Sequence, residues 1–159
     1  MELYLLRHGT AAHGAGKDAD RPLTAEGKAE VSAVAARARA AGVKPDAILS
    51  SPLRRAIETA KLAAAALGYD GKIEQTRALE PERPAEDVWE EIVARAGAEQ
   101  ILLASHQPLM GDLLSWLLNS PYTCAEFKKG ALARVDVEPT ASRPRGVLVW
   151  LITPRLLRS

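Results

Sequence analysis

Cysteine is almost absent from this sequence, in which Cys124 is the only one among 159 residues. A lone cysteine excludes an internal disulfide and also excludes zinc sites built from several cysteine ligands. Long apolar runs are missing too, since none approaches the ~20 residues that a membrane-spanning helix needs. The first residues lack the basic stretch and cleavage site of a secretory signal. We therefore expect a cytoplasmic protein without a membrane partner.

An excess of charge of one sign is also missing, because 21 lysine and arginine residues face 20 aspartate and glutamate residues. This balance argues against nucleic acid as a partner, so any basic site must be local. With 47% hydrophobic and 26% charged residues, the chain has the composition of an ordinary folded protein. It shows no fixed repeat and no linker, so we expect residues 1–159 to form a single domain.

Short apolar runs alternate with helical patterns along the chain. Three runs are typical of strands buried on both faces: residues 3–6, 47–49 and 101–104. Helical periodicity predicts four helices: residues 25–41, 53–67, 85–98 and 109–118. This alternation predicts an α/β fold, a three-layer sandwich with a mostly parallel central sheet flanked by helices. A last pair of apolar stretches, residues 131–137 and 147–152, predicts an antiparallel strand addition at the sheet edge.

Histidine and arginine gather where the expected parallel strands end, which is where open α/β sheets bind their ligands. The three segments after these strands are Arg7-His8-Gly9-Thr10, Ser50-Ser51-Pro52-Leu53-Arg54-Arg55 and Ser105-His106-Gln107-Pro108. Two of the three histidines therefore occupy equivalent strand ends. The third, His13, lies in a Gly/Ala-rich loop and is expected to be exposed or structural.

Arginines in one cleft favour a phosphate ligand, because the guanidinium fork matches phosphate oxygens. We expect Arg55 to serve the site rather than Arg54, since Ala56 and an apolar helix face follow it. A neutral imidazole can attack phosphorus through one ring nitrogen when the other donates its proton to a backbone carbonyl. A second imidazole can donate hydrogen bonds to the equatorial oxygens during in-line transfer. Gly9 is expected to let the backbone approach the phosphate.

Four segments carry a family resemblance. They are Leu5-Leu6-Arg7-His8-Gly9, Arg21-Pro22-Leu23-Thr24 before a helix with Gly27, the stretch from Ser50 to Ala60, and Ser105-His106. In this order they resemble the histidine phosphatase (phosphoglycerate mutase-like) superfamily, over residues 3–118. The short chain and the spacing resemble the SixA-type branch of that superfamily, the protein-phosphohistidine phosphatases.

The resemblance implies a role for each matching residue. His8 corresponds to the nucleophile that becomes phosphorylated. The phosphate pocket corresponds to Arg7, Arg55 and His106, with Arg21 as an accessory basic residue. No metal and no other cofactor is implied. Glu80 lies in roughly the stretch where mutases and acid phosphatases carry their catalytic acid, so it is a candidate proton donor, with an ordinary loop carboxylate as the alternative.

The substrate class is inferred from the leaving group and from the space for a lid. Phosphohistidine expels imidazole, whose conjugate acid has a pKa of about 6.5, so it needs a dedicated acid less than an alcohol ester does. About 20 residues separate Leu79 from Ile101, which leaves an open pocket suited to a phosphorylated protein. Only the loop over residues 11–20 is placed to fold over it. The alternatives are a phosphatase for small phosphoesters and a phosphate-binding regulatory module without turnover.

Three further patterns carry no chemistry in this interpretation. Cys124 is not followed by arginine six positions later, so the cysteine-phosphatase loop is absent and the thiol is expected to be buried or idle. Asp18-Ala19-Asp20 is interpreted as a turn, and Gly14-Ala15-Gly16 lacks the preceding strand of a nucleotide-binding loop. The tail over residues 154–159 is expected to fray.

Overall fold

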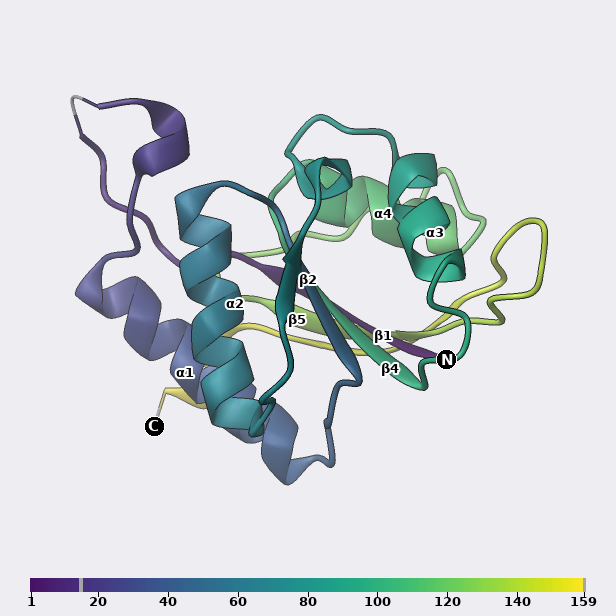
Figure 1. Cartoon of the computed structure of the whole chain (residues 1–159), viewed down its shortest axis with the longest axis horizontal. Coiled ribbons are helices and arrows are strands. Elements are labelled where there is room, and N and C mark those ends of the chain that lie inside the picture. Colours follow the sequence, from purple (N-terminus) through teal and green to yellow (C-terminus); the bar gives the residue numbers. More distant parts are fainter. Residues whose placement is uncertain (15, 159) are drawn as a thin grey trace.

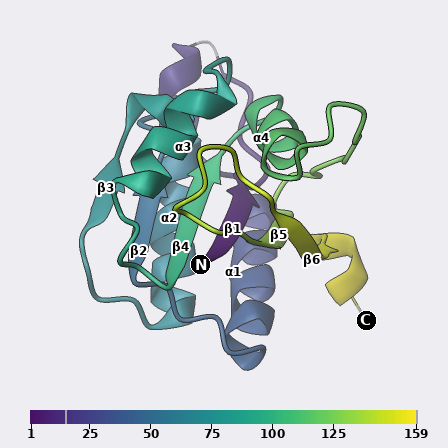
Figure 2. The ribbon, with the colours of Figure 1, turned by 90° about the vertical axis from the view of Figure 1, so that its right-hand side faces the viewer.

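The computed structural model describes residues 1–14 and 16–158, and within them the chain forms a six-stranded mixed sheet. Residue 15 of the glycine-rich loop and residue 159 of the tail lie outside the described residues. In chain order the strands are β1 (Glu2–Arg7), β2 (Ala47–Ser50), β3 (Ile73–Gln75), β4 (Gln100–Ser105), β5 (Leu132–Asp136) and β6 (Val147–Ile152). Their spatial order is β3-β2-β4-β1-β5-β6, which Figure 2 shows from left to right.

Helices cover both faces of the sheet (Figure 1). The principal helices of the described residues are α1 (Ala25–Ala40), α2 (Arg54–Leu67), α3 (Ala85–Val93) and α4 (Leu109–Leu117). Apolar residues of α1 and α2 form one core with one face of β1, β2 and β4, and those of α3 and α4 form a second core on the opposite face. The α/β sandwich expected from the sequence is therefore confirmed. In the described part of the chain, no helix is long and apolar enough to cross a membrane.

The sheet register sets the positions of the strand ends. β1 and β2 each pair in parallel with β4, so that Arg7 lies opposite Ser105 and Ser50 lies opposite Ala104. β5 and β6 continue the sheet as antiparallel strands, as expected for the edge addition. The carboxyl ends of three neighbouring strands thus lie at one level, and the segments that follow them meet above the sheet.

The first turn of α1 packs closely against the loop after β1. Thr24 caps the helix, because its hydroxyl oxygen accepts a hydrogen bond from the Gly27 amide at 3.0 Å. A Cβ on Gly27 would lie 2.1 Å from the carbonyl oxygen of Thr10, and one on Gly9 would lie 2.7 Å from that of Gly27. The close approach that the structure shows at Gly9 is to α1, and the role of Gly9 beside a phosphate stays a prediction.

Two elements differ from the sequence-based expectations. The helix predicted over residues 85–98 ends at Val93, because the chain turns through residues 94–98 to start β4 at Gln100. The carboxylate of Asp46 accepts hydrogen bonds from the amides of Glu99 and Gln100, both at 2.8 Å, and holds that start in place. The sequence analysis also missed β3, which has only three residues and pairs with β2 alone.

The prediction of a frayed tail is wrong for the described residues up to 158. Pro154–Leu157 forms a 3-10 helix, η3, in which Pro154 is buried. Arg158 is held by carboxylates of α1, with Glu26 at 3.1 Å and Glu30 at 2.7 Å. These contacts with α1 fix the tail beside the end of β1 that carries Arg7. Cys124, whose thiol the sequence predicts to be buried or idle, is exposed, so the buried alternative is wrong.

Candidate active site

Two buried histidines meet above the ends of β1 and β4. The ring centroids of His8 and His106 are 5.1 Å apart, and the two side chains belong to residues only 7% and 1% exposed. His8 is held by its backbone, whose amide donates to the carbonyl oxygen of Ser105 at 2.9 Å. Segments nearly 100 residues apart are thus brought together by the parallel pairing of their strands.

The imidazole of His8 is oriented as a nucleophile. Its Nδ1 lies 2.7 Å from the carbonyl oxygen of Gly9. Because a carbonyl oxygen only accepts, we assign the proton to Nδ1, which leaves the lone pair on Nε2. Burial lowers the pKa of His8 to about 4, and the positive charges of Arg55 and Arg7 act in the same direction. The ring is therefore neutral at physiological pH.

His106 is prepared to donate a hydrogen bond. Its Nε2 lies 2.8 Å from the hydroxyl oxygen of Ser51, which also accepts from the Leu53 amide at 3.3 Å. Because this hydroxyl oxygen accepts from Leu53, we assign the hydroxyl as the donor to Nε2, which leaves the His106 proton on Nδ1. Burial and the neighbouring His8 lower the pKa of His106 to about 3, so this ring is also neutral. Its Nδ1 is buried and has no partner among the described residues.

Each of the two expected arginines donates at least one terminal nitrogen to a protein acceptor, and the Nε of each has no partner among the described residues. Arg7 donates from Nη1 to the Phe127 carbonyl at 2.6 Å. Arg55 donates from Nη1 to the Asp18 carbonyl at 3.0 Å and from Nη2 to the Asp18 carboxylate at 3.1 Å. In the described chain, the buried side-chain nitrogens without a partner are Arg7 Nε, Arg55 Nε and His106 Nδ1. All three belong to the pocket expected from the sequence.

The three nitrogens without a hydrogen-bond partner in the described chain indicate a site for a ligand that accepts hydrogen bonds. Leaving a buried donor unsatisfied costs about 1–3 kcal/mol, so such groups cluster where a ligand supplies acceptors. A tetrahedral oxyanion offers several acceptor oxygens at once, and charged donors favour it. The arrangement therefore fits a phosphoryl group held beside Nε2 of His8.

Asp18 is the residue that the sequence analysis missed. The sequence predicts a turn at Asp18, and in the structure its carboxylate also bridges Arg55 and Arg21, with Arg21 Nη1 at 3.0 Å. Hydrogen bonding to Arg21, together with the charge of Arg55, holds its pKa below the usual range. No sequence signal marks this role, because Asp18 and Arg55 are 37 positions apart. The loop over residues 11–20 thus reaches the site through its described residue Asp18.

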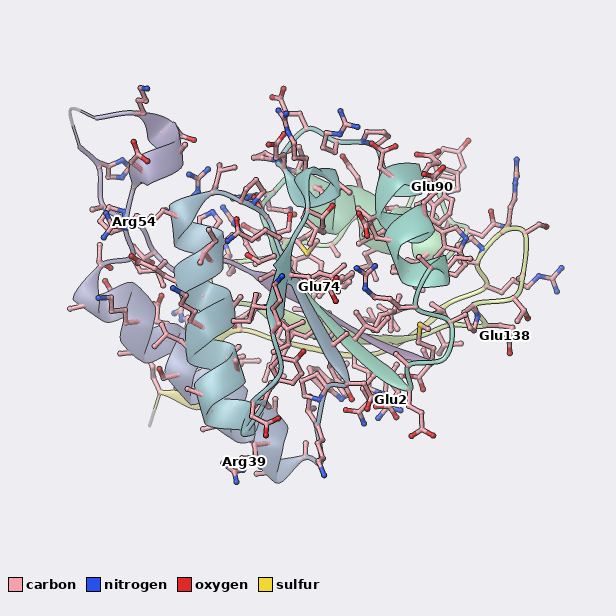
Figure 3. All side chains as sticks on the ribbon, viewed as in Figure 1. Glu2, Arg39, Arg54, Glu74, Glu90 and Glu138 are labelled. Carbon is pink, nitrogen blue, oxygen red and sulfur yellow. The ribbon has the colours of Figure 1, made fainter. Side chains whose placement is uncertain are left out.

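Arg21 and Arg54 differ in how they contact the residues of the site. Arg21 donates from Nε to the Ala12 carbonyl at 2.8 Å and pairs with Asp18, so among the described contacts it braces the loop and is linked to Arg55 through Asp18. Arg54, labelled beside the start of α2 in Figure 3, has a 55% exposed side chain and pairs with Glu58 at 2.8 Å. The side chain of Arg55 is 7% exposed. Of the two adjacent arginines, the structure therefore brings Arg55 into the pocket.

Glu80 is not brought into contact with the two histidines. Its carboxylate accepts from Arg77 Nε at 3.2 Å, and its side chain is 27% exposed. The backbone before it is anchored to the site, because the Ser105 hydroxyl donates to the Leu79 carbonyl at 2.7 Å. In the hydrogen bonds and ion pairs of the described residues, Arg77 is the side-chain partner of Glu80. The structure thus places this segment beside β4 but pairs the carboxylate with an exposed arginine.

Comparison with known proteins agrees with the geometry. A family model described as histidine phosphatase superfamily (branch 1) matches residues 3–80. An uncharacterized protein of Picosynechococcus is 41% identical over 115 residues, which cover 70% of each chain. The phosphohistidine phosphatase SixA of Escherichia coli is 28% identical over 156 residues, 97% of this chain and 94% of that protein. A solved structure of the protein histidine phosphatase SixA complexed with tungstate superimposes with a TM-score of 0.91 at 29% identity, covering 99% of this chain and 100% of that one. The chain therefore belongs to branch 1 of the histidine phosphatase superfamily.

Proposed function

We propose that this protein is a phosphatase that removes the phosphoryl group from protein phosphohistidine, through a covalent phosphohistidine at His8 and without a metal. One observation carries the proposal. A neutral, buried His8 packs beside His106 and feels the charges of Arg55 and Arg7, and the side chains of these three residues each have a buried nitrogen without a partner in the described chain. Similarity to the phosphohistidine phosphatase SixA supports the same substrate class.

Turnover takes two displacements at phosphorus. In the first, the substrate's phosphohistidine ring carries a proton from solvent on its other nitrogen. The Nε2 lone pair of His8 attacks phosphorus, and the bond from phosphorus to the substrate's nitrogen breaks, so that the ring leaves as neutral imidazole. In the second, water attacks phosphorus, the bond to Nε2 breaks, and phosphate leaves with a neutral His8 restored. Arg7, Arg55 and His106 donate to the equatorial oxygens throughout, which stabilises the charge that spreads over them.

The position of Glu80 favours phosphohistidine over an alcohol ester. Expulsion of an alkoxide gains roughly 10²- to 10⁴-fold from a positioned acid, and the Glu80 carboxylate is paired with Arg77 instead. A substrate ring that is protonated on its other nitrogen leaves as neutral imidazole, whose conjugate acid has a pKa of about 6.5, so no acid has to protonate the nitrogen that leaves phosphorus. The described donors thus supply what phosphohistidine hydrolysis needs without a carboxylic acid.

The test is phosphate release, in the presence of a chelator, from an N-phosphohistidine peptide and from a panel of small phosphomonoesters. Wild type is expected to release phosphate faster from the peptide. His8→Ala is expected to lose turnover and the alkali-stable phosphorylation of the protein itself. Glu80→Gln is expected to match wild type. Faster release from esters that depends on Glu80 would assign a small-molecule phosphatase instead. Tight tungstate binding without turnover of any substrate would assign a regulatory phosphate-binding module.

A further inference from the structure

A basic groove shares Arg7 with the candidate active site. It is a cavity of about 1040 Å³ in which Arg7 is one of the lining residues. Its basic lining residues are Arg7, Lys128, Lys129, Arg155 and Arg158. Two carboxylates, from Glu30 and Glu126, also line it. In a chain with a formal net charge of only +1, this is a local concentration of positive charge.

The groove walls are built onto the backbone of the catalytic strand. The Gly130 amide donates to the His8 carbonyl at 3.0 Å, and the Arg7 amide donates to the Ala131 carbonyl at 3.0 Å. The opposite wall is the tail, where a Cβ on Gly130 would lie 3.0 Å from a ring carbon of Pro154. Both walls are therefore fixed relative to the phosphate pocket.

The positive charge of the groove is only partly neutralised within the protein. Arg158 pairs with Glu30, and Lys128 pairs with Glu126. Lys129 and Arg155, both exposed, form no ion pair among the described residues. The charge of Lys129 reaches His8, where it contributes to the lowered pKa of that ring. Lys129, whose charge acts on His8, and Arg155 of the tail are thus the groove cations that no carboxylate of the described residues neutralises.

We propose that this groove binds an acidic protein segment next to the phosphorylated histidine of the substrate, an inference that rests on the proposed function. Because the groove shares Arg7 with the site and its other lining residues lie outside the site, a phosphohistidine bound at His8 would place the neighbouring residues of the substrate in the groove. Carboxylates on those residues complement Lys129 and Arg155, which speeds encounter and selects among phosphoproteins. Because the charges are exposed, added salt weakens the selection.

The test uses two N-phosphohistidine peptides, flanked on each side by three glutamates or by three alanines, and free phosphohistidine. We expect wild type to prefer the glutamate peptide in kcat/KM at low salt, with the preference lost near 0.5 M salt. Arg155→Glu is expected to reduce kcat/KM for the glutamate peptide roughly fivefold, mainly through KM, because repulsion replaces a surface attraction. Turnover of the alanine peptide and of free phosphohistidine should stay at wild-type rates.

The matched control is Arg145→Glu, the same charge reversal on an exposed residue of the β5–β6 connection, at the opposite end of the sheet from the groove. It should leave all three substrates at wild-type rates. Equal turnover of both peptides by wild type, or equal effects of Arg155→Glu and Arg145→Glu, would overturn the docking proposal and leave the phosphatase assignment intact. If wild type cleaved none of the phosphohistidine substrates, the proposed function itself would fall, and this proposal with it.

Discussion

Burial of His8 in its neutral form makes the stability of the protein depend on pH in a specific window. The pKa of this imidazole is about 4 in the folded protein and about 6.5 in the unfolded chain. Stability from the neutral ring is therefore fully present above pH 6.5 and is lost progressively as the pH falls toward 4. At pH 5 the unfolded chain binds this proton and the folded protein mostly does not, which costs about 2 kcal/mol of unfolding free energy.

The variant His8→Asn removes this titration. Its unfolding free energy should fall about 2 kcal/mol less than that of wild type between pH 7.5 and pH 5. The assay is urea unfolding at both pH values in buffers free of phosphate, so that no anion stabilises the pocket. The control is His13→Asn, which replaces an exposed histidine of the loop after β1. This variant is expected to show the same fall in unfolding free energy as wild type. An equal fall in His8→Asn and wild type would refute the reasoning.

Three further predictions concern the pocket and its support. Arg55→Ala should weaken tungstate binding by about 10- to 100-fold in a calorimetric titration, because a charged donor is lost. Arg54→Ala should change tungstate binding less than twofold. The reverse order would exclude Arg55 from the pocket. Asp18→Asn should raise KM roughly threefold with kcat nearly unchanged in steady-state kinetics, because a partly exposed ion pair that orients Arg55 is lost, and an unchanged KM would contradict a positioning role. Gly27→Ala should lower the free energy of unfolding in urea by about 3 kcal/mol, since its methyl carbon would lie 2.1 Å from a backbone carbonyl oxygen. A Cβ at Gly14 meets nothing within 4 Å, so Gly14→Ala should unfold like wild type.

The strands that carry the site were predictable because each has a strong local signal. Leu3 to Leu6 and Ile101 to Ala104 are buried on both faces in the structure, so an uninterrupted apolar run marks them in the sequence. β3 has no such signal, since Glu74 and Gln75 follow its one apolar residue and it lies at the sheet edge. Local pattern therefore finds central strands and misses a short polar edge strand.

Long-range ionic contacts explain what the sequence did not show about the site. The bridge from Asp18 to Arg55 depends on how a loop crosses the start of α2, which no residue spacing encodes. The ordered tail has the same origin, because Arg158 is fixed by carboxylates of α1 more than 120 positions away. The rule that ligands bind at the carboxyl ends of parallel strands places Arg7, His8 and His106 in one region. It does not predict side chains such as Asp18 that reach this region from a loop.

The register between β1 and β4 has a consequence for how this family of chains tolerates insertions and deletions. Arg7 and Ser105 occupy the same rung of the ladder, one residue before each pocket histidine. One residue added inside β4 would shift His106 by about 3.3 Å along the strand and turn its side chain to the opposite face of the sheet. The connections at the other end of the sheet, such as the one between β5 and β6, carry no pocket residue. We therefore expect changes in length to be tolerated best at that end, which makes the β5–β6 connection the place to graft a peptide tag or a second protein without disturbing the site.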